Sequence, residues 1–279
     1  MRCRSPNFSF AITSEPANDC VAVRYKLTIA YDGTAFHGWQ LQPQRRTVQA
    51  VLEAGVARLT GETPRVNASG RTDAGVHADG QVVAFDLARP WEPRKLHLGL
   101  NAVTAGDVSV KSVEIVADGF DPRRWATSRR YVYRIWNATW DSPFLRRYAW
   151  RLSHELDVEA MHAAALHLIG EHDFTSFRAS QCDAETPVRR IYRSEIARSG
   201  SGELIEYTVE ATAFLRHMVR NVVGTLVEVG RGARAAGDMP ALLSARDRKL
   251  AAATAPPRGL SLEEVRYAGK RGAASPLPR

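Results

Sequence analysis

Alternating apolar and polar positions mark the strands of the first half of the chain. Residues 25–31 alternate in this way and meet Asp32-Gly33, which predicts a strand followed by a turn. From Val48 to Leu59 apolar residues recur at helical spacing, and Gly61 follows as a stop signal. Residues 81–87 and 108–116 are then expected to be strands, and residues 96–103 a helix behind Pro93. Strands and helices therefore alternate at short intervals.

The second half repeats this rhythm. Residues 131–137 predict a strand, and the apolar stripe from Val158 to Leu168 predicts a helix that ends at Gly170. Residues 191–198 and 204–212 predict a hairpin around the glycine-containing turn at 199–202. We expect a helix over 213–229, a further helix over 240–251, and a closing strand over 262–267.

Two halves with this element order indicate an α+β fold. We expect two ferredoxin-like, or RRM-like, subdomains with mainly antiparallel sheets, helices on one face, and a basic RNA-binding cleft between them. Within the 279 residues, the predicted boundaries are a flexible N-terminal extension over 1–23, an N-terminal subdomain over 24–127, a C-terminal subdomain over 128–269 and a tail over 270–279. No residue-level repeat relates the halves.

The charge balance adds a polyanion as an expected partner. The chain has 38 Lys plus Arg against 30 Asp plus Glu, a net charge of +8 that favours nucleic acid through counterion release. Only five of these basic residues are lysines, so most of the charge is on guanidinium groups, which suit phosphate. Eight of the arginines lie between Asp121 and Arg151, interleaved with Tyr and Trp, at positions 123, 124, 129, 130, 134, 146, 147 and 151. This cluster is typical of an RNA-binding surface.

Cysteine usage and hydropathy indicate a cytoplasmic protein. Cys3, Cys20 and Cys182 form neither a CxxC pair nor an even disulfide framework, which is typical of plain thiols in a reducing compartment. No apolar run is long enough to span a membrane, and residues 1–23 lack the apolar core of a signal peptide.

The stretch from Gly70 to His77, GRTDAGVH, carries the most chemical information. It places Arg71 two residues before Asp73 in a loop framed by glycines, where the backbone can approach a ligand closely. Taken alone, Asp-Ala-Gly is most often a simple turn, and Arg-x-Asp is most often a structural ion pair. The stretch gains weight from its combination with other blocks of residues along the chain.

Six blocks in order resemble the tRNA pseudouridine synthase A family. GRTDAGVHA from Gly70 is similar to that family's active-site loop, in which the aspartate is the essential catalytic residue. The other blocks are Tyr31-Asp-Gly33 with Gly38-Trp-Gln40, Arg130-Tyr-Val-Tyr133, Gly170-Glu-His-Asp-Phe174, Phe214-Leu-Arg-His-Met-Val-Arg-Asn221 and Gly259-Leu260. The resemblance covers roughly residues 24–267 and leaves out the N-terminal extension and the C-terminal tail.

The resemblance implies an isomerisation in which the glycosidic C–N bond of a uridine breaks and the uracil rejoins the same ribose through carbon. Asp73 would attack the sugar carbon or take a proton from the neighbouring ribose carbon, and the sequence leaves both roles open. Arg71 is the expected partner that positions Asp73. Arg220 and Tyr131 match the family's active-site arginine and tyrosine, and Leu260 matches an apolar position near the base.

Further residues are expected to contact RNA. His217 and Arg220 are three residues apart on the helix predicted over 213–229, so both would point from one face toward RNA phosphate. Arg129 and Arg130 are candidates for the phosphate-contacting surface. The alternatives without a role in RNA binding are a packed histidine, a packed strand tyrosine at position 131 and solvated arginines.

The resemblance further implies a cofactor-free enzyme that acts on the tRNA anticodon arm at positions 38 to 40 and works as a homodimer. We expect no metal, because the histidines show no ligand spacing with cysteine or acid. Two alternatives remain: a non-catalytic tRNA-binding or remodelling protein of the same fold, and a hydrolase of N-glycosidic bonds. The hydrolase would normally need a second acid or base to activate water, and no such carboxylate pair is evident.

Overall fold

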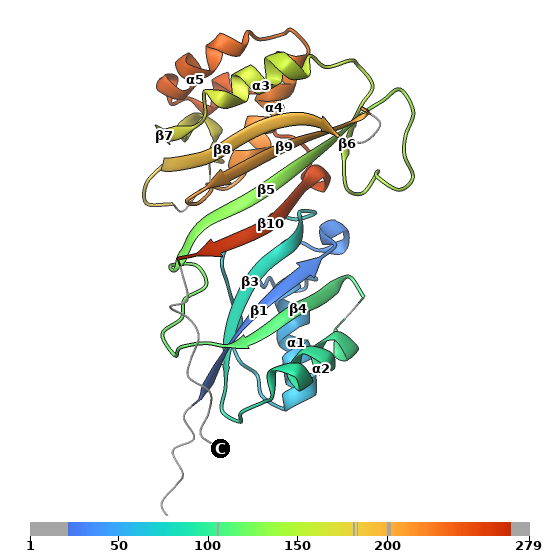
Figure 1. Cartoon of the computed structure of the whole chain (residues 1–279), viewed down its shortest axis with the longest axis vertical. Coiled ribbons are helices and arrows are strands. Elements are labelled where there is room, and N and C mark those ends of the chain that lie inside the picture. Colours follow the sequence, from blue (N-terminus) through green and yellow to red (C-terminus); the bar gives the residue numbers. More distant parts are fainter. Residues whose placement is uncertain (1–21, 105, 181, 183, 200–201, 269–279) are drawn as a thin grey trace, which may run out of the picture.

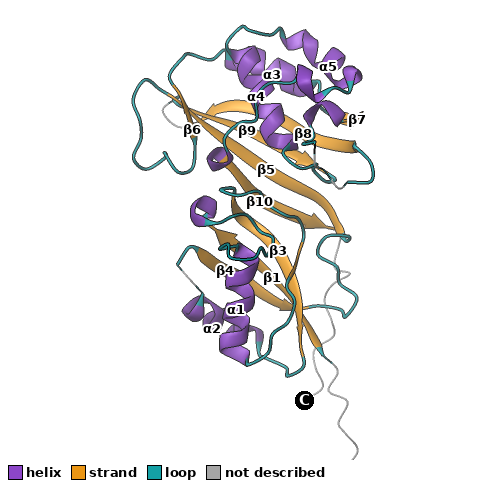
Figure 2. Cartoon of the chain, turned by 180° about the vertical axis from the view of Figure 1, so that it is seen from behind, coloured by secondary structure: helices purple, strands orange, loops and turns teal. Residues whose placement is uncertain are grey.

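One continuous mixed sheet runs through the computed structural model, which describes residues 22–104, 106–180, 182, 184–199 and 202–268. Within these ranges the main path of the sheet has the order β4-β1-β3-β10-β5-β9-β8-β7, with β2 paired to β3 and β6 paired to β5. Figures 1 and 2 show the helices together on one face of this sheet, α1 and α2 over one half and α3, α4 and α5 over the other. The α+β class and the one-sided helices are therefore confirmed, while the division into two subdomains stays a prediction.

The strands and helices of the N-terminal half lie close to where the hydrophobic pattern predicts them. The strands are β1 Val23–Tyr31, β2 Asn67–Ala68, β3 His77–Leu87 and β4 Val108–Ile115, and the helices are α1 Val48–Thr60 and α2 Pro93–Val103. Thr47 caps α1 by accepting a hydrogen bond from the Ala50 amide, and Gly61 ends the helix in the left-handed conformation at φ +76°. Alternate residues of β1, namely Tyr25, Leu27 and Ile29, are fully buried beneath these helices.

The C-terminal half contributes β5 Ala126–Asn137, β6 Trp150–Leu152, β7 Gly170–Asp173, β8 Val188–Ser199, β9 Leu204–Ala211 and β10 Leu260–Tyr267. Its helices are α3 Val158–Leu166, α4 Met218–Gly230 and α5 Met239–Ala245. The predicted hairpin is confirmed as β8 and β9, which pair antiparallel from Ile191 to Ser199. The helix expected over 213–229 is corrected, because it begins only at Met218, and the helix expected over 240–251 is also corrected, because it ends at Ala245.

The last strand of the chain joins the two halves. β10 pairs parallel with β3 through Ser261 and Leu262, and antiparallel with β5 along its whole length. As a result a single hydrophobic cluster extends from β1 residues to β10 residues beneath the helices. The face of the sheet without helices carries ion pairs between strands, such as Arg134–Glu206 at 2.9 Å and Arg266–Glu210 at 3.0 Å, together with a small apolar cluster of Val82, Ala84, Val116 and Phe120.

Three expectations concern the ends of the chain. The N-terminal extension predicted over 1–23 falls almost entirely on residues 1–21, which lie outside the described residues, and β1 already begins at Val23. The predicted tail over 270–279 also lies outside them, as do Cys3 and Cys20. Among the described residues no helix is long and apolar enough to cross a bilayer.

Gly80 allows β3 and β10 to approach each other. A Cβ atom at this position would lie 2.2 Å from the carbonyl oxygen of Glu263, which is backbone and cannot move aside. We therefore expect Gly80→Ala to lower the free energy of unfolding by roughly 1–3 kcal/mol through overpacking at the seam between the halves. The measurement is the denaturant midpoint, with Gly119→Ala as the control because a Cβ at Gly119 meets nothing within 4 Å. Equal midpoints for the two variants would contradict this prediction.

Candidate active site

A cleft of about 1160 Å³ opens where the halves meet, and its walls come from both of them. One wall is the loop 70–76 that precedes β3, and the other is the segment 213–220 that leads into α4. Among the described residues, seven arginines line the cleft against two acids, Asp73 and Asp121. The electrostatic potential inside the cleft is therefore positive, and Asp73 places a carboxylate within it.

Asp73 is held from across the cleft. Its Oδ2 atom accepts a hydrogen bond from Nη1 of Arg220 at 3.0 Å, and Nε2 of His217 lies 3.6 Å from the same oxygen. The Arg220 side chain is only 13% exposed, and its Nε donates to the carbonyl oxygen of Ala255 at 2.7 Å. The guanidinium is thus fixed at both ends, so it can fix the direction of the carboxylate.

Arg71 is not the partner of Asp73 that the sequence led us to expect. Its side chain is exposed at the cleft wall, and among the described residues it forms no ion pair with Asp73. The partner of Asp73 is Arg220, which lies 147 positions away along the chain. The expectation that Arg71 positions Asp73 is therefore corrected, since the guanidinium that holds this carboxylate is that of Arg220.

The loop around Asp73 is fixed by its own half of the molecule. Thr72 shares a hydrogen bond of 2.8 Å with the hydroxyl of Tyr31 and accepts one from the Trp39 amide at 3.1 Å on its carbonyl oxygen. Gln81, fully buried on β3, donates to the carbonyl oxygen of Gly70 at 2.8 Å. Tyr31 and Trp39 belong to blocks that resemble the family, but no pattern in the sequence indicated that they touch this loop.

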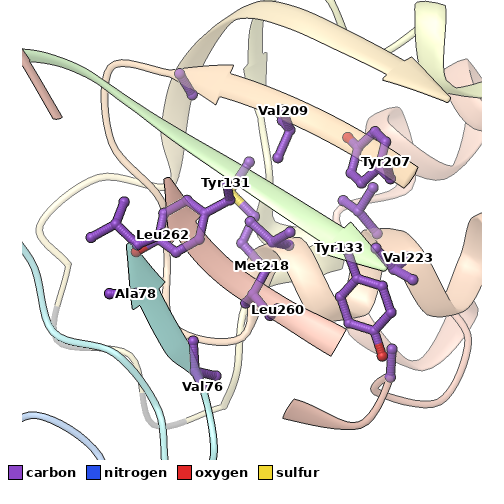
Figure 3. Packing of buried hydrophobic residues seen from close by; sticks show 14 of the residues in the cluster. Val76, Ala78, Tyr131, Tyr133, Tyr207, Val209, Met218, Val223, Leu260 and Leu262 are labelled. Carbon is purple, nitrogen blue, oxygen red and sulfur yellow. The ribbon is translucent and has the colours of Figure 1, made fainter. Parts of the chain in front are cut away.

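Tyr131 and Leu260 both line the cleft. Tyr131 lies on β5 directly opposite Leu262 of β10, and Figure 3 shows these two side chains next to each other. The Tyr131 ring meets Phe214 edge to face at a centroid distance of 5.1 Å. Burial raises the pKa of Tyr131 well above its usual value, so the phenol stays protonated at neutral pH. Phe214 begins one of the blocks that resemble the family, but its contact with Tyr131 was not expected.

His217 reaches Asp73 from an unexpected backbone position. The prediction that it shares a helix face with Arg220 is wrong, because His217 precedes α4 and is left-handed, at φ +61°. A residue other than glycine is rare in this region, at a cost of about 1 kcal/mol or more. Burial is the main cause that lowers the His217 pKa, against the opposing effect of Asp73. The ring is therefore neutral at pH 7.

Arg129 and Arg130 point to opposite faces of β5. Arg130 forms an ion pair with Glu264 at 3.0 Å on the uncovered face of the sheet and does not line the cleft. Arg129 borders the cleft but is only 8% exposed. Because successive side chains of a strand point to opposite faces, these two neighbours point in opposite directions. The expectation that both contact phosphate is corrected for Arg130.

Comparison with known proteins shows the family of the chain. The sequence model described as tRNA pseudouridine synthase matches residues 27–123 and 164–268. The chain belongs to the tRNA pseudouridine synthase family. A tRNA pseudouridine synthase A of Myxococcus xanthus is 50% identical over 244 residues, which is 88% of this chain and 92% of that one.

Two further relatives of the same name cover most of the chain. The synthase of Geotalea uraniireducens is 45% identical over 87% of this chain and 98% of its own length. That of Azorhizobium caulinodans is 46% identical over 88% of this chain and 94% of its own. A solved archaeal box H/ACA sRNP Nop10–Cbf5 complex is similar over 72% of this chain and 53% of that chain at 13% identity, with a TM-score of only 0.31.

The last residue of the GRTDAGVH stretch, His77, is buried beside a second contact between the halves. Its Nδ1 accepts a hydrogen bond from the Gly33 amide at 3.0 Å, so Nε2 carries the hydrogen and donates to the carbonyl oxygen of Arg147 at 3.0 Å. Burial is the largest cause that lowers the pKa of His77, while Asp32, 3.2 Å away, opposes it. Protonation would place a hydrogen on Nδ1 and break the bond to Gly33.

Stability should therefore fall on acidification. Because the pKa of His77 is lower in the folded state than in the unfolded chain, its contribution is present above about pH 6.5 and is lost as pH falls through the folded pKa. Titration of one group changes the free energy of unfolding by at most about 1.4 kcal/mol per pH unit. Unfolding free energies of wild type and His77→Gln between pH 5 and 8 measure this. A wild-type slope no steeper than that of His77→Gln would contradict the assignment.

Proposed function

We propose that this protein is a tRNA pseudouridine synthase that uses Asp73 to isomerise uridine. The single observation that carries the proposal is the Asp73–Arg220 contact of 3.0 Å inside a positively charged cleft. A carboxylate fixed by a guanidinium at the floor of an arginine-lined cleft suits a reaction on a ribose within a polyanion. The relatives named tRNA pseudouridine synthase A support tRNA as the substrate.

The proposed chemistry needs one acidic side chain. Asp73 acts either by attack on C1′ of the target ribose or by taking a proton from C2′, and in both routes the C1′–N1 bond breaks. The uracil turns and its C5 bonds to C1′, which breaks the Asp73–C1′ bond in the first route and is accompanied by return of the proton to C2′ in the second. The hydrogen on C5 then leaves as a proton and N1 gains one. Since the uracil itself returns to the sugar, no activating water and no second carboxylate are required, in contrast to hydrolysis of a glycoside.

The other side chains of the cleft supply binding and order. The exposed guanidinium of Arg71 is placed to contact a phosphate of the incoming strand. Tyr131, with Leu260 beside it on the floor, offers an apolar surface against which a uracil taken out of its stack can pack. His217, neutral and 3.6 Å from Asp73, borders the same space.

Three finer expectations are part of the proposal. The anticodon arm with positions 38 to 40 as the target, and the homodimer with RNA spanning both subunits, rest on the family resemblance. The cytoplasm as the place of action rests on the cysteine usage and hydropathy of the sequence. The competing candidate with the same fold is a protein that binds tRNA without turnover. A glycosidic hydrolase would differ from both by releasing free uracil.

Asp73→Asn separates these candidates. On unmodified tRNA that carries tritium at C5 of uracil, we expect the wild type to release tritium to water and Asp73→Asn to lose this release by roughly a thousandfold or more, because the amide can neither attack nor accept the proton. The dissociation constant for the same tRNA should change little.

Three results would contradict the proposal in different ways. Normal release by Asp73→Asn would remove Asp73 from the chemistry. Binding without release by the wild type would favour the non-catalytic protein. Free uracil among the products would favour the hydrolase.

A further inference from the structure

Arg129 donates hydrogen bonds to four main-chain carbonyl oxygens. Nη1 donates to Thr212 at 2.7 Å and to Ala126 at 3.2 Å, while Nη2 donates to Arg123 at 2.6 Å and to Ser69 at 3.0 Å. A guanidinium has five N–H groups, so four of them are occupied within the protein. With the side chain 8% exposed, little of this charge is available to a phosphate.

Two of these carbonyl groups belong to the loops that bring the reacting side chains together. Ser69 stands directly before the loop of Asp73, in the N-terminal half. Thr212 directly follows β9, at the start of the segment that leads to Arg220 at the beginning of α4. One side chain on β5 thus holds the roots of both loops whose tips meet in the 3.0 Å contact of Asp73 and Arg220.

Of the other two carbonyl groups, that of Arg123 lies in the segment that connects β4 to β5 and so joins the halves, and that of Ala126 belongs to the first residue of β5. The Ser69 side is also fixed from within its own half, where its hydroxyl donates to Oε1 of Gln81 at 2.7 Å. Since Gln81 is fully buried, Ser69 cannot shift without breaking that bond. Arg129 therefore links the Thr212 carbonyl to a Ser69 residue that is itself held by a buried side chain, and does not merely cover a loose loop.

The desolvation of a buried guanidinium costs free energy, which offsets much of what its hydrogen bonds add to stability. Desolvation lowers the pKa of Arg129, and apolar side chains of similar volume often replace buried charges without loss of stability. What an apolar side chain cannot supply is the fixed direction of four N–H groups toward four backbone segments. This geometry therefore fixes the position of the Asp73 loop relative to the Arg220 segment. The reaction requires this fixed position, and folding does not.

We propose that Arg129 is a positioning residue for uridine isomerisation, which keeps the Asp73 loop and the Arg220 segment in register and does not bind tRNA itself. This inference rests on the proposed function and replaces the expectation of a phosphate contact at this position. A misplacement of about 1 Å at a reacting group can cost a hundredfold in rate, so loss of the registration affects turnover before binding.

Arg129→Lys and Arg129→Met test this, with Arg130→Lys and Arg130→Met as matched controls on the neighbouring residue of the same strand. Three quantities are measured for each variant: the rate of tritium release at saturating tRNA, the dissociation constant over a range of salt concentrations, and the thermal unfolding midpoint. We expect the rate of both Arg129 variants to fall roughly tenfold to a hundredfold. Their dissociation constants and salt dependence should match the wild type, and the Arg130 variants should release tritium at the wild-type rate.

Chemical rescue separates positioning from a general loss of structure. Guanidinium chloride at low millimolar concentration, well below denaturing levels, should restore part of the release rate of Arg129→Ala and leave wild type and Arg130→Ala unchanged. A folded Arg129→Lys with the wild-type rate would overturn the inference. The result expected of a phosphate contact would also overturn it. In that case tRNA binding weakens, the slope of log affinity against log salt concentration falls by about one, and the release rate at saturating tRNA is unchanged.

The remaining outcomes are also decisive. If the Arg129 variants melt earlier but reach the wild-type rate at a temperature where they are folded, Arg129 is structural and the inference is wrong. If the wild type releases no tritium, the proposed function fails, and this is seen without any Arg129 variant.

Discussion

The structure depends on one ion pair between side chains from opposite halves of the chain. Asp73 comes from the loop before β3 and Arg220 from the first turn of α4, and their atoms meet at 3.0 Å. Each of the two segments is also held by hydrogen bonds to other groups. Gln81 and Tyr31 fix the first loop, while the bond from Arg220 to Ala255 fixes the second. The cleft is therefore prepared before any substrate enters.

The central position of β10 explains how a sheet of two halves can keep such a contact. The last strand of the described chain lies between β3 and β5, so the Asp73 loop and Tyr131 are carried by strands that flank the same neighbour. Gly80 permits the close approach at this seam, and Arg129 adds a second link that runs through carbonyl oxygens. The Arg130–Glu264 ion pair lies on the face without helices, whereas Arg129 and Tyr131 border the cleft on the helix-covered face.

The hydrophobic pattern predicted most of the fold and the local part of the site. Period-two runs indicated the strands, and Gly61 marked the end of α1 correctly, because these signals act over a few residues. The start of α4 was misplaced since Phe214 and Leu215 continue the apolar spacing, while the left-handed turn at His217 depends on packing around it. The partner of Asp73 could not be found by proximity in sequence, because Arg71 is near along the chain and Arg220 is near in space. Charge alone likewise could not separate Arg129 from Arg130, whereas strand parity and burial do.

The central claim is that Asp73 and Arg220 act as one unit on the ribose, and a double-mutant cycle on single-turnover tritium release tests it most directly. With tRNA saturating, Arg220→Met should lower the rate by roughly a hundredfold, as loss of a preorganised charge partner does. Adding Arg220→Met to Asp73→Asn should then lower the rate no further than Asp73→Asn alone. A wild-type rate for a folded Arg220→Met, or fully multiplicative effects in the double variant, would contradict the account.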